Sequence, residues 1–202
     1  CCSTAAGPAF EGAGISCGMP AKEGAINKVY LYDGKIFYTT IGSAPPTGIC
    51  GSGLIDAVAC MLELGVVDET GYLDQHFELG DSGVYIKPAD IRAVQLAKSA
   101  IRAGIETLAD DISSIDKFYI AGGFGNYVSI RSCVKIGLIP KEAESRAIVI
   151  GNSAGTGACM VLQSKACLAE SEKIAKKAVA VELSESREFM EKYIENMSFT
   201  EV

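Results

Sequence analysis

The chain has 202 residues, of which 49% are hydrophobic, and a formal net charge of −7 with acidic and basic residues interspersed. This length and apolar content suffice for one substantial domain with a real core, or for two small ones. An acidic balance without a basic face excludes a nucleic-acid partner, and no apolar run approaches the roughly 20 residues of a membrane-spanning helix, so we expect neither nucleic acid nor a membrane as partner.

Eight cysteines are scattered along the chain without any Cys-x-x-Cys pair, and His76 is the single histidine. This spacing predicts no metal site. In a domain with a good core, such cysteines are expected to be buried small hydrophobic residues in a reducing cytoplasm. Adjacent Cys1 and Cys2 would suit ligation or crosslinking, although a strand end is the simpler interpretation. The chain begins without a methionine, and we expect it to be a fragment of a longer protein.

Residues 1–27 are rich in Gly, Ala and Ser, which permit backbone segments to approach closely. Ser3 and Thr4 stand before the turn pair Gly7-Pro8, where their hydroxyl and N–H groups are suited to contact an anion at a helix start. Ser and Thr before a helix also serve as N-caps, and capping is the favoured role for this pair.

Two β-rich runs, residues 29–32 and 35–41, flank the pair Asp33-Gly34. Asp-Gly between such runs is typical of a tight β-hairpin turn. Further on, residues 66–88 hold glycine turns, which predicts a peripheral insertion of short strands within the domain. His76 lies in this insertion, and we assign it no role.

Gly51, Ser52 and Gly53 precede an apolar helical pattern over residues 54–64, with Gly65 as its stop. A glycine-serine turn at a helix start either contacts phosphate through unsatisfied N–H groups or lets two elements pack closely. The two interpretations stay level at this point.

The longest predicted helix covers residues 91–109, with Asp90 placed to cap it. Apolar residues recur at helical spacing and predict one buried stripe. Three polar residues lie off that stripe, and a solvated face is the expected explanation, although Lys98 is also suited to contact a phosphate. The stripe is Ile91, Val94, Ala97, Ile101, Ile105 and Leu108, and the polar residues are Gln95, Lys98 and Arg102.

The apolar run Phe118 to Ala121 ends abruptly in a glycine-rich turn, which indicates a buried strand followed by a site. Gly122, Gly123 and Gly125 free three backbone positions from the restriction that a Cβ imposes on φ. Such a turn at the carboxyl end of a strand lets a ligand touch main-chain atoms directly. Phe124 lies within the turn, and Asn126 adds an amide that both donates and accepts.

The same pattern recurs further on. Residues 147–150 are predicted to form a second apolar strand, which ends in Gly151-Asn152, and a helix is predicted to follow over residues 153–162. After Asn126 we also expect a helix, which reaches Cys133. Two strands that end side by side in glycine-asparagine turns make a nucleotide cleft more credible than either turn alone.

The carboxyl-terminal part is predicted to hold a polar helix around residues 173–177, a strand over residues 178–183 and a final amphipathic helix over residues 186–197. The apolar face of the last helix is expected to dock on the parent domain, and a subunit interface is the alternative. That face is Phe189, Met190, Tyr193, Ile194 and Met197.

The order of these motifs resembles the carboxyl-terminal domain of the reductive activators of corrinoid proteins, and the motifs cover most of the chain. The resemblance implies an α/β fold of the actin, hexokinase and chaperone ATPase superfamily (ASKHA), in which residues 1–202 form a ribonuclease-H-like lobe with a mixed sheet flanked by helices. The motifs are Ser3 to Gly12, Gly48 to Asp56, Gln95 to Lys98, Ile120 to Asn126, and Gly151-Asn152 with Gly157-Ala158.

The resemblance also implies a function: ATP-dependent electron delivery that reduces cob(II)alamin to methyl-accepting cob(I)alamin in a corrinoid methyl-transfer protein. Members of the family are similar in joining this domain to an amino-terminal [2Fe–2S] domain, whose cysteines are absent from this sequence. We expect ATP and Mg²⁺ as cofactors of the full-length protein, a corrinoid protein as partner, a homodimer and a cytoplasmic location. Since reduction of cob(II) is uphill from a ferredoxin-type donor, ATP must bind differently to two conformations of activator and partner.

Carried over by position, Gly122, Gly123 and Asn126 match the superfamily's adenosine motif, and Gly151 occupies the place of the following connecting segment. The superfamily's Asp-x-Gly-Thr phosphate loops are missing from the sequence, so no catalytic residue can be named. The full set of expected nucleotide contacts is Ser3, Thr4, Gly51, Ser52, Gly53, Gly122, Gly123, Phe124, Gly125, Asn126, Gly151 and Asn152.

Three alternatives compete with this function. A small-molecule kinase of the same superfamily would need a carboxylate base, and none is evident beside the glycine turns. An activator of another target, such as a dehydratase, would hold a cluster through a cysteine pair that does not stand out here. A non-catalytic module would only dimerise or dock the corrinoid protein, which an apolar surface on the last helix would favour.

Overall fold

The computed structural model describes residues 1–109, 111–123, 125 and 127–199. A mixed three-stranded sheet of order β2-β1-β3 is formed by β1 (Ala25–Tyr32), β2 (Lys35–Thr40) and β3 (Gly48–Ile49). β1 pairs antiparallel with β2 and parallel with β3. The hairpin turn falls on Asp33 and Gly34, which both have positive φ (49° and 69°), as the Asp-Gly pair predicts.

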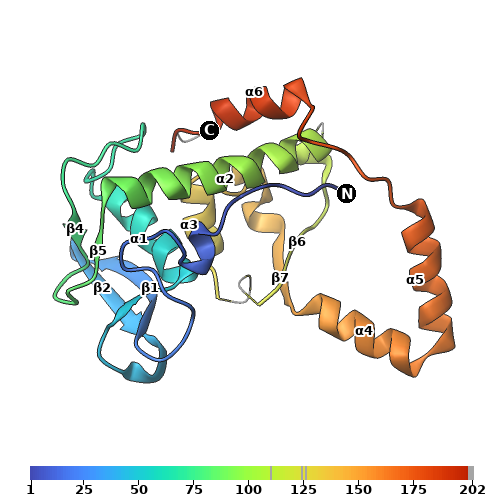
Figure 1. Ribbon diagram of the computed structural model, residues 1–202, viewed down its shortest axis with the longest axis horizontal. Coiled ribbons are helices and arrows are strands. Elements are labelled where there is room, and N and C mark those ends of the chain that lie inside the picture. Colours follow the sequence, from blue (N-terminus) through green and yellow to red (C-terminus); the bar gives the residue numbers. More distant parts are fainter. Residues whose placement is uncertain (110, 124, 126, 200–202) are drawn as a thin grey trace.

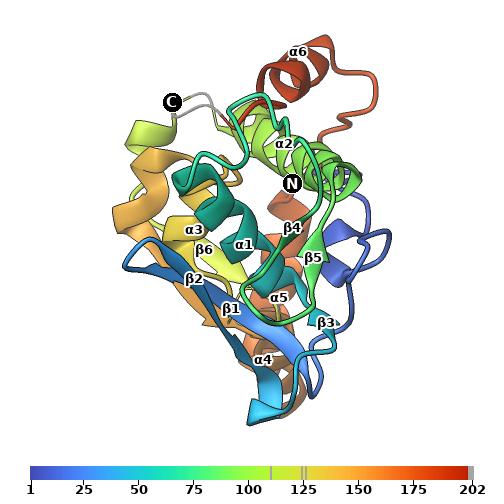
Figure 2. The same ribbon diagram turned by 90° about the vertical axis from the view of Figure 1, so that its left-hand side faces the viewer.

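Two long helices stack over this sheet. α1 (Gly51–Glu63) packs on β1, and α2 (Pro88–Leu108) lies on the other side of α1, so that α1 is sandwiched between α2 and the hairpin in both views (Figures 1 and 2). The facing side chains of the sheet and the two helices form the core. Its residues with at most 1% exposure include Ile26, Ile49, Leu54, Ile55, Val58, Met61, Ile91 and Val94. The helix predicted over 54–64 and its stop at Gly65, with φ +67°, are confirmed.

The segment of residues 66–88 contains an antiparallel pair, β4 (Phe77–Glu78) and β5 (Tyr85–Ile86). Its apolar residues Leu73, Leu79 and Ile86 are buried in the same core as α1 and α2. His76 is exposed, with its ring against Tyr85 at 5.6 Å between centroids.

A second, parallel pair lies apart from the three-stranded sheet and consists of β6 (Phe118–Ala121) and β7 (Ala147–Gly151). Each strand is followed by a helix, α3 (Ile130–Lys135) after β6 and α4 (Ser153–Gln163) after β7, as the sequence predicts. The prediction that these two strands are buried is wrong. Tyr119 on β6 is 55% exposed, and Ile148, Val149 and Ile150 on β7 are between 37% and 41% exposed. α4 and α5 (Lys165–Lys177) extend away from the helices of the core and leave β7 largely uncovered (Figure 1).

The polar face of α2 is not solvated, which corrects the sequence-based expectation. Gln95, Lys98 and Arg102 are 4%, 1% and 6% exposed, because α6 (Arg187–Glu195) and the residues after it lie over α2 (Figure 2). Gln95 Nε2 donates to the carbonyl oxygen of Met197 at 2.9 Å, and Ser99 Oγ donates to that of Asn196 at 2.7 Å. The last helix therefore docks on the parent domain, although Met190 and Ile194 on its apolar face stay 50% and 65% exposed.

Two smaller expectations need correction. Residues 178–183 form no strand. In the described part of the chain, their pairing with a distant segment is limited to Cys1: Val181 N–H donates to Cys1 O at 2.8 Å, and the Cys1 amino group donates to Val179 O at 2.7 Å. Asp90 lies in the first turn of α2, inside the cap position at Lys87, where its carboxylate accepts from the N–H groups of Lys87 and Ser16 at 2.8 Å each.

Short 3₁₀ turns complete the described elements: η1 (Ala9–Glu11), η2 (Ile41–Ser43), η3 (Ile112–Ser114) and η4 (Lys141–Arg146). The stripe predicted on α2 is buried at Ile91, Val94 and Ala97, whereas Leu108 at its end is 47% exposed. None of the helices built from the described residues combines the length and the apolar character that crossing a membrane demands.

We expect Gly53→Ala to destabilise the chain by roughly 1–3 kcal/mol, the usual cost of overpacking a well-packed interior. A Cβ at position 53 would lie 2.3 Å from the backbone oxygen of Ile26, so α1 would have to move away from β1. Urea unfolding at equilibrium measures the effect. Gly157→Ala is the matched control, since a Cβ there meets no atom within 4 Å and the change should raise stability slightly. Equal stability of Gly53→Ala and wild type would contradict the close packing.

Candidate functional site

A cavity of about 730 Å³ lies where the start of α1 meets the glycine turn after β6. This volume falls within the range of about 300–1,000 Å³ that small-molecule sites usually occupy. Its wall combines residues from η1, the first hairpin, the start of α1 and the turn after β6. Among the lining residues are Phe10, Glu11, Met19, Asn27, Thr40, Cys50, Gly51, Ser52, Gly123 and Tyr127.

The three residues that open α1 have different roles. Gly53 allows close packing, because its Cα faces the backbone of Ile26 on β1. Ser52 is buried, and its hydroxyl donates to the Asn27 carbonyl at 2.9 Å, which ties the helix start to β1. Gly51 and Ser52 line the cavity, and no side chain caps the N-terminus of α1. The packing interpretation is therefore confirmed at Gly53, whereas phosphate contact by Gly51 and Ser52 stays a prediction.

The glycines after β6 also separate into two kinds. Gly122 has φ +100°, and its N–H donates to the Gly151 oxygen at 2.8 Å, which continues the pairing of β6 with β7. Gly125 is buried, and a Cβ there would lie 2.8 Å from Ile120 Cγ2, so this position serves packing. Gly123 lines the cavity, and a Cβ there would meet no atom within 4 Å. Phe124 and Asn126, both expected contacts, lie outside the described residues.

The remaining expected contacts do not line this cavity. Gly151 and Asn152 lie beside Gly122 at the end of β7, where the Asn152 side chain accepts from Gly155 N–H at 3.0 Å and caps α4. Ser3 is exposed. Thr4 packs on α2, because a Cβ on Gly104 would come within 2.5 Å of its methyl group. The prediction that this pair caps a helix is wrong, since η1 is preceded by Pro8 and has no side-chain cap.

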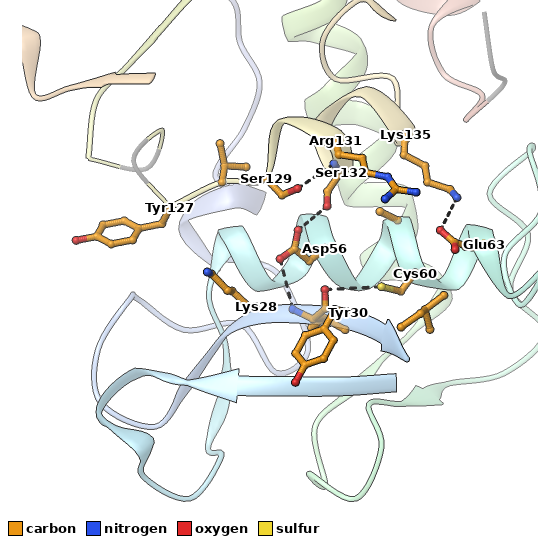
Figure 3. Close-up of a pocket in the computed structure, with 14 residues that line it drawn as sticks. Lys28, Tyr30, Asp56, Cys60, Glu63, Tyr127, Ser129, Arg131, Ser132 and Lys135 are labelled. Atoms are coloured by element: carbon orange, nitrogen blue, oxygen red, sulfur yellow. Dashed lines mark hydrogen bonds and ion pairs between the residues drawn. The ribbon is translucent and has the colours of Figure 1, made fainter. Parts of the chain in front are cut away.

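A second cavity, of about 560 Å³, has Tyr127 as a lining residue in common with the first, and its residues are drawn in Figure 3. At its centre Asp56 projects from α1 toward α3 and β1. Its Oδ1 accepts from Ser132 Oγ at 2.6 Å, and its Oδ2 accepts from Val29 N–H at 3.4 Å. Asp56 is only 5% exposed, so one carboxylate joins three elements inside the molecule.

Burial shifts the pKa values of two side chains that line this second cavity. It raises the pKa of Asp56 above its ordinary value, although the bonds from Ser132 and Val29 and the charge of Lys28 oppose this rise. Burial also raises the pKa of the neighbouring Cys60 thiol to about 11, with the Asp56 charge adding to the effect. At the edge, Lys135 pairs with Glu63 at 2.7 Å (Figure 3). Sequence reasoning missed the part played by Asp56, although it is the only charged residue between 54 and 62.

The expectation that the cysteines are buried holds for Cys50, Cys60 and Cys133, whereas Cys1 and Cys159 are exposed. Burial raises the pKa of the Cys133 thiol to about 12, which makes it a neutral core residue. Within the described part of the chain, no three His, Cys, Asp or Glu side chains gather closely enough to hold a metal ion.

Comparisons with known proteins agree on one family. The family model described as the C-terminal domain of RACo, the ASKHA domain, matches residues 1–202. The corrinoid activation enzyme RamQ of Eubacterium limosum is 37% identical over 98% of this chain and 39% of its own length. The [Co(II) methylated amine-specific corrinoid protein] reductase of Methanosarcina barkeri is 30% identical over 88% of this chain and 38% of its own length.

A solved structure, titled reductive activator for corrinoid,iron-sulfur protein, matches with a TM-score of 0.86 and 37% identity. The match covers 98% of this chain and 36% of that chain. The chain thus spans less than two-fifths of the length of these three relatives.

The raised pKa of Asp56 predicts a pH-dependent effect of Asp56→Asn. Because the folded chain holds this proton more tightly than the unfolded chain, the group favours folding at low pH, and this contribution is lost as the pH rises through the folded pKa. The variant has no such titration. We therefore expect the free energy of unfolding of Asp56→Asn, relative to that of wild type, to increase as the pH rises from about 3 to about 7.

Urea unfolding at both pH values measures this shift. Asp116→Asn, at an exposed loop position, controls for the loss of one negative charge. A stability difference between Asp56→Asn and wild type that stays constant, or that moves against the variant as the pH rises, would contradict the assignment.

Proposed function

Because the chain belongs to the family of the C-terminal ASKHA domain of RACo, we propose that it is the nucleotide-binding part of an activator that couples ATP binding and hydrolysis to the reduction of cob(II)alamin to cob(I)alamin in a corrinoid protein. The family and the α/β ASKHA fold are those that the sequence motifs predict. The proposal draws its partner from the relatives, which are named as an activation enzyme, a reductase and a reductive activator of corrinoid proteins.

One observation carries the nucleotide assignment: the start of α1 and the glycine turn after β6 line the same cavity. N–H groups in the first turn of a helix lack intrahelical partners, and the helix dipole adds positive potential there. In α1 no side chain caps these groups. Gly51 and Ser52 are therefore suited to receive phosphate oxygens, as helix N-termini do in other nucleotide sites.

The other wall fits the nucleoside. At Gly123 a Cβ would meet open space, so the bare backbone leaves room for a flat group to lie against it. Tyr127 stands at the boundary of the cavity and offers an aromatic face to the base. In this assignment the nucleoside lies along Gly123 and Tyr127, and the phosphates extend toward α1.

The metal cofactors of the proposal fit this chain unequally. Mg²⁺ in nucleotide sites is held by one or two carboxylates together with the phosphates, and Glu11 is the carboxylate among the lining residues of the cavity. When bound, the ion would neutralise phosphate charge. A [2Fe–2S] cluster needs four ligands, and the described residues bring no three suitable side chains together. The proposal therefore places the cluster outside residues 1–202.

The coupling is a difference in binding free energy. Reduction of cob(II) from a ferredoxin-type donor is uphill, so ATP must favour one conformation of the activator with its partner over another. Here the nucleotide would contact both the start of α1, which follows β3, and the turn after β6, and these two strands belong to separate sheets. A change in their separation is thus the motion that ATP would select. A homodimer in the cytoplasm completes the proposal, and the exposed Met190 and Ile194 of α6 suit a subunit contact.

We expect Gly123→Val to abolish or strongly weaken ATP binding without changing the fold. The added side chain projects into open space, so it fills the cavity instead of straining the core. Isothermal titration calorimetry with Mg²⁺ and ATP measures binding, and circular dichroism checks the fold. Gly157→Ala, whose added methyl group also meets no atom within 4 Å, should bind like wild type.

If Gly123→Val binds ATP with wild-type affinity, this cavity is not the nucleotide site. If ATP binds as expected, the chain in its full-length protein should also accelerate the appearance of the cob(I)alamin absorption spectrum in a corrinoid protein when ATP is added. An ATP-independent rate of reduction would contradict the coupling.

A further inference from the structure

A third cavity, of about 230 Å³, lies between α2, α3, η4 and the residues that follow α6. It shares no lining residue with the cavity at Gly123. Basic side chains from three helices line it, although the chain as a whole carries a net charge of −7. These cations are Lys98, Arg102, Arg131, Lys135 and Lys141.

Two of the five cations are almost completely buried. Lys98 is 1% exposed and Arg102 is 6% exposed, one turn apart on α2. The ammonium group of Lys98 donates to the Ser198 carbonyl oxygen and lies 5.3 Å from the centre of the Phe199 ring. Within the described residues it has no carboxylate partner. A buried charge without a counter-ion is costly, and proteins usually pair it.

The carboxylate nearest to these two cations does not balance both. Glu106 accepts from Arg102 Nε at 2.6 Å with one oxygen and from the Asn196 amide at 2.7 Å with the other. The terminal nitrogens of Arg102 make no hydrogen bond to any described residue and remain available to the cavity. Burial and the neighbouring Arg102 lower the pKa of Lys98 to about 8, so the amine is still mostly protonated at neutral pH.

The charges at the solvent side do not change this balance. Glu144 and Glu195 line the cavity but are exposed, and exposed carboxylates are strongly screened by water. Lys135 is already paired with Glu63 at 2.7 Å. Arg131 and Lys141 are exposed and form no ion pair with the described residues. The buried end is thus positive, and two unpaired cations stand at the entrance.

We propose that this cavity is a second anion site that binds a small phosphate-bearing ligand, with Lys98 and Arg102 at its buried end and Arg131 and Lys141 at its entrance. The geometry suits a phosphate group, because a guanidinium offers paired donors and an ammonium offers a point charge to its oxygens. The bound anion would also join α2 and α3 to the carboxyl-terminal residues, since Asn196 and Ser198 line the same cavity.

The test titrates inorganic phosphate into the chain by calorimetry at constant ionic strength, with chloride as the balancing anion. Arg131→Gln/Lys141→Gln removes two exposed cations, so it should fold normally and weaken phosphate binding about tenfold. Lys173→Gln/Lys177→Gln, on the exposed face of α5, removes the same charge and should leave the affinity unchanged. Saturable wild-type binding with this pattern supports the site. Absence of saturable binding, or equal weakening by both double variants, overturns it.

Two further measurements make the assignment specific. Gly123→Val should bind phosphate like wild type, because that residue lines a different cavity; loss of binding in this variant would assign the signal to the nucleotide cavity and overturn the proposal. Phosphate should also slow amide hydrogen exchange in residues 187–199 of the wild type. Exchange in that segment that does not respond to saturating phosphate would equally contradict the site.

Discussion

The close approach of α1 to β1 is the contact on which the rest of the described structure depends. It exists because Gly53 has no side chain where the helix meets the backbone of Ile26. Once the two elements touch, Ser52 donates to the carbonyl of Asn27, and Asp56, one turn later, accepts from the N–H of Val29. Three successive contacts thus fix both the position and the rotation of α1, and a fixed rotation keeps the first turn of the helix on the wall of the cavity of about 730 Å³.

The features that could be predicted from the sequence are those whose conformation depends on residues close by in the chain. The Asp33-Gly34 hairpin, the helix that stops at Gly65 and the paired strands that end at Gly122 and Gly151 all have causes within a few residues, namely φ restrictions and periodicity. The candidate site was predicted in part for the same reason. Gly51, Ser52 and Gly123 line one cavity, although nucleotide contact there stays a prediction, and Thr4 packs on α2 away from that cavity.

The errors concern contacts between residues far apart in the sequence. Lys98 has the pattern of a solvated residue, and only the return of the chain a hundred positions later buries it. Residues 178–183 have the composition of a strand, but a strand also needs a partner over several residues, and here the pairing involves Cys1 alone. Asp56 was overlooked because its partners, Val29 and Ser132, lie on two other elements. No local pattern encodes such coincidences.

The attachment of the carboxyl-terminal segment to α2 has an evolutionary consequence. Gln95, Lys98 and Ser99 each donate from α2 to a main-chain oxygen, at Met197, Ser198 and Asn196 respectively. Every residue type offers this oxygen, so these three bonds recognise the path of the segment and not its side chains. The Asn196 amide and the Phe199 ring, which contact Glu106 and Lys98 of α2, are the side-chain contacts that supplement them. Substitutions at Met197 and Ser198 can therefore accumulate without losing the attachment, whereas the three donors on α2 must be retained. The two halves of this contact are free to diverge at very different rates.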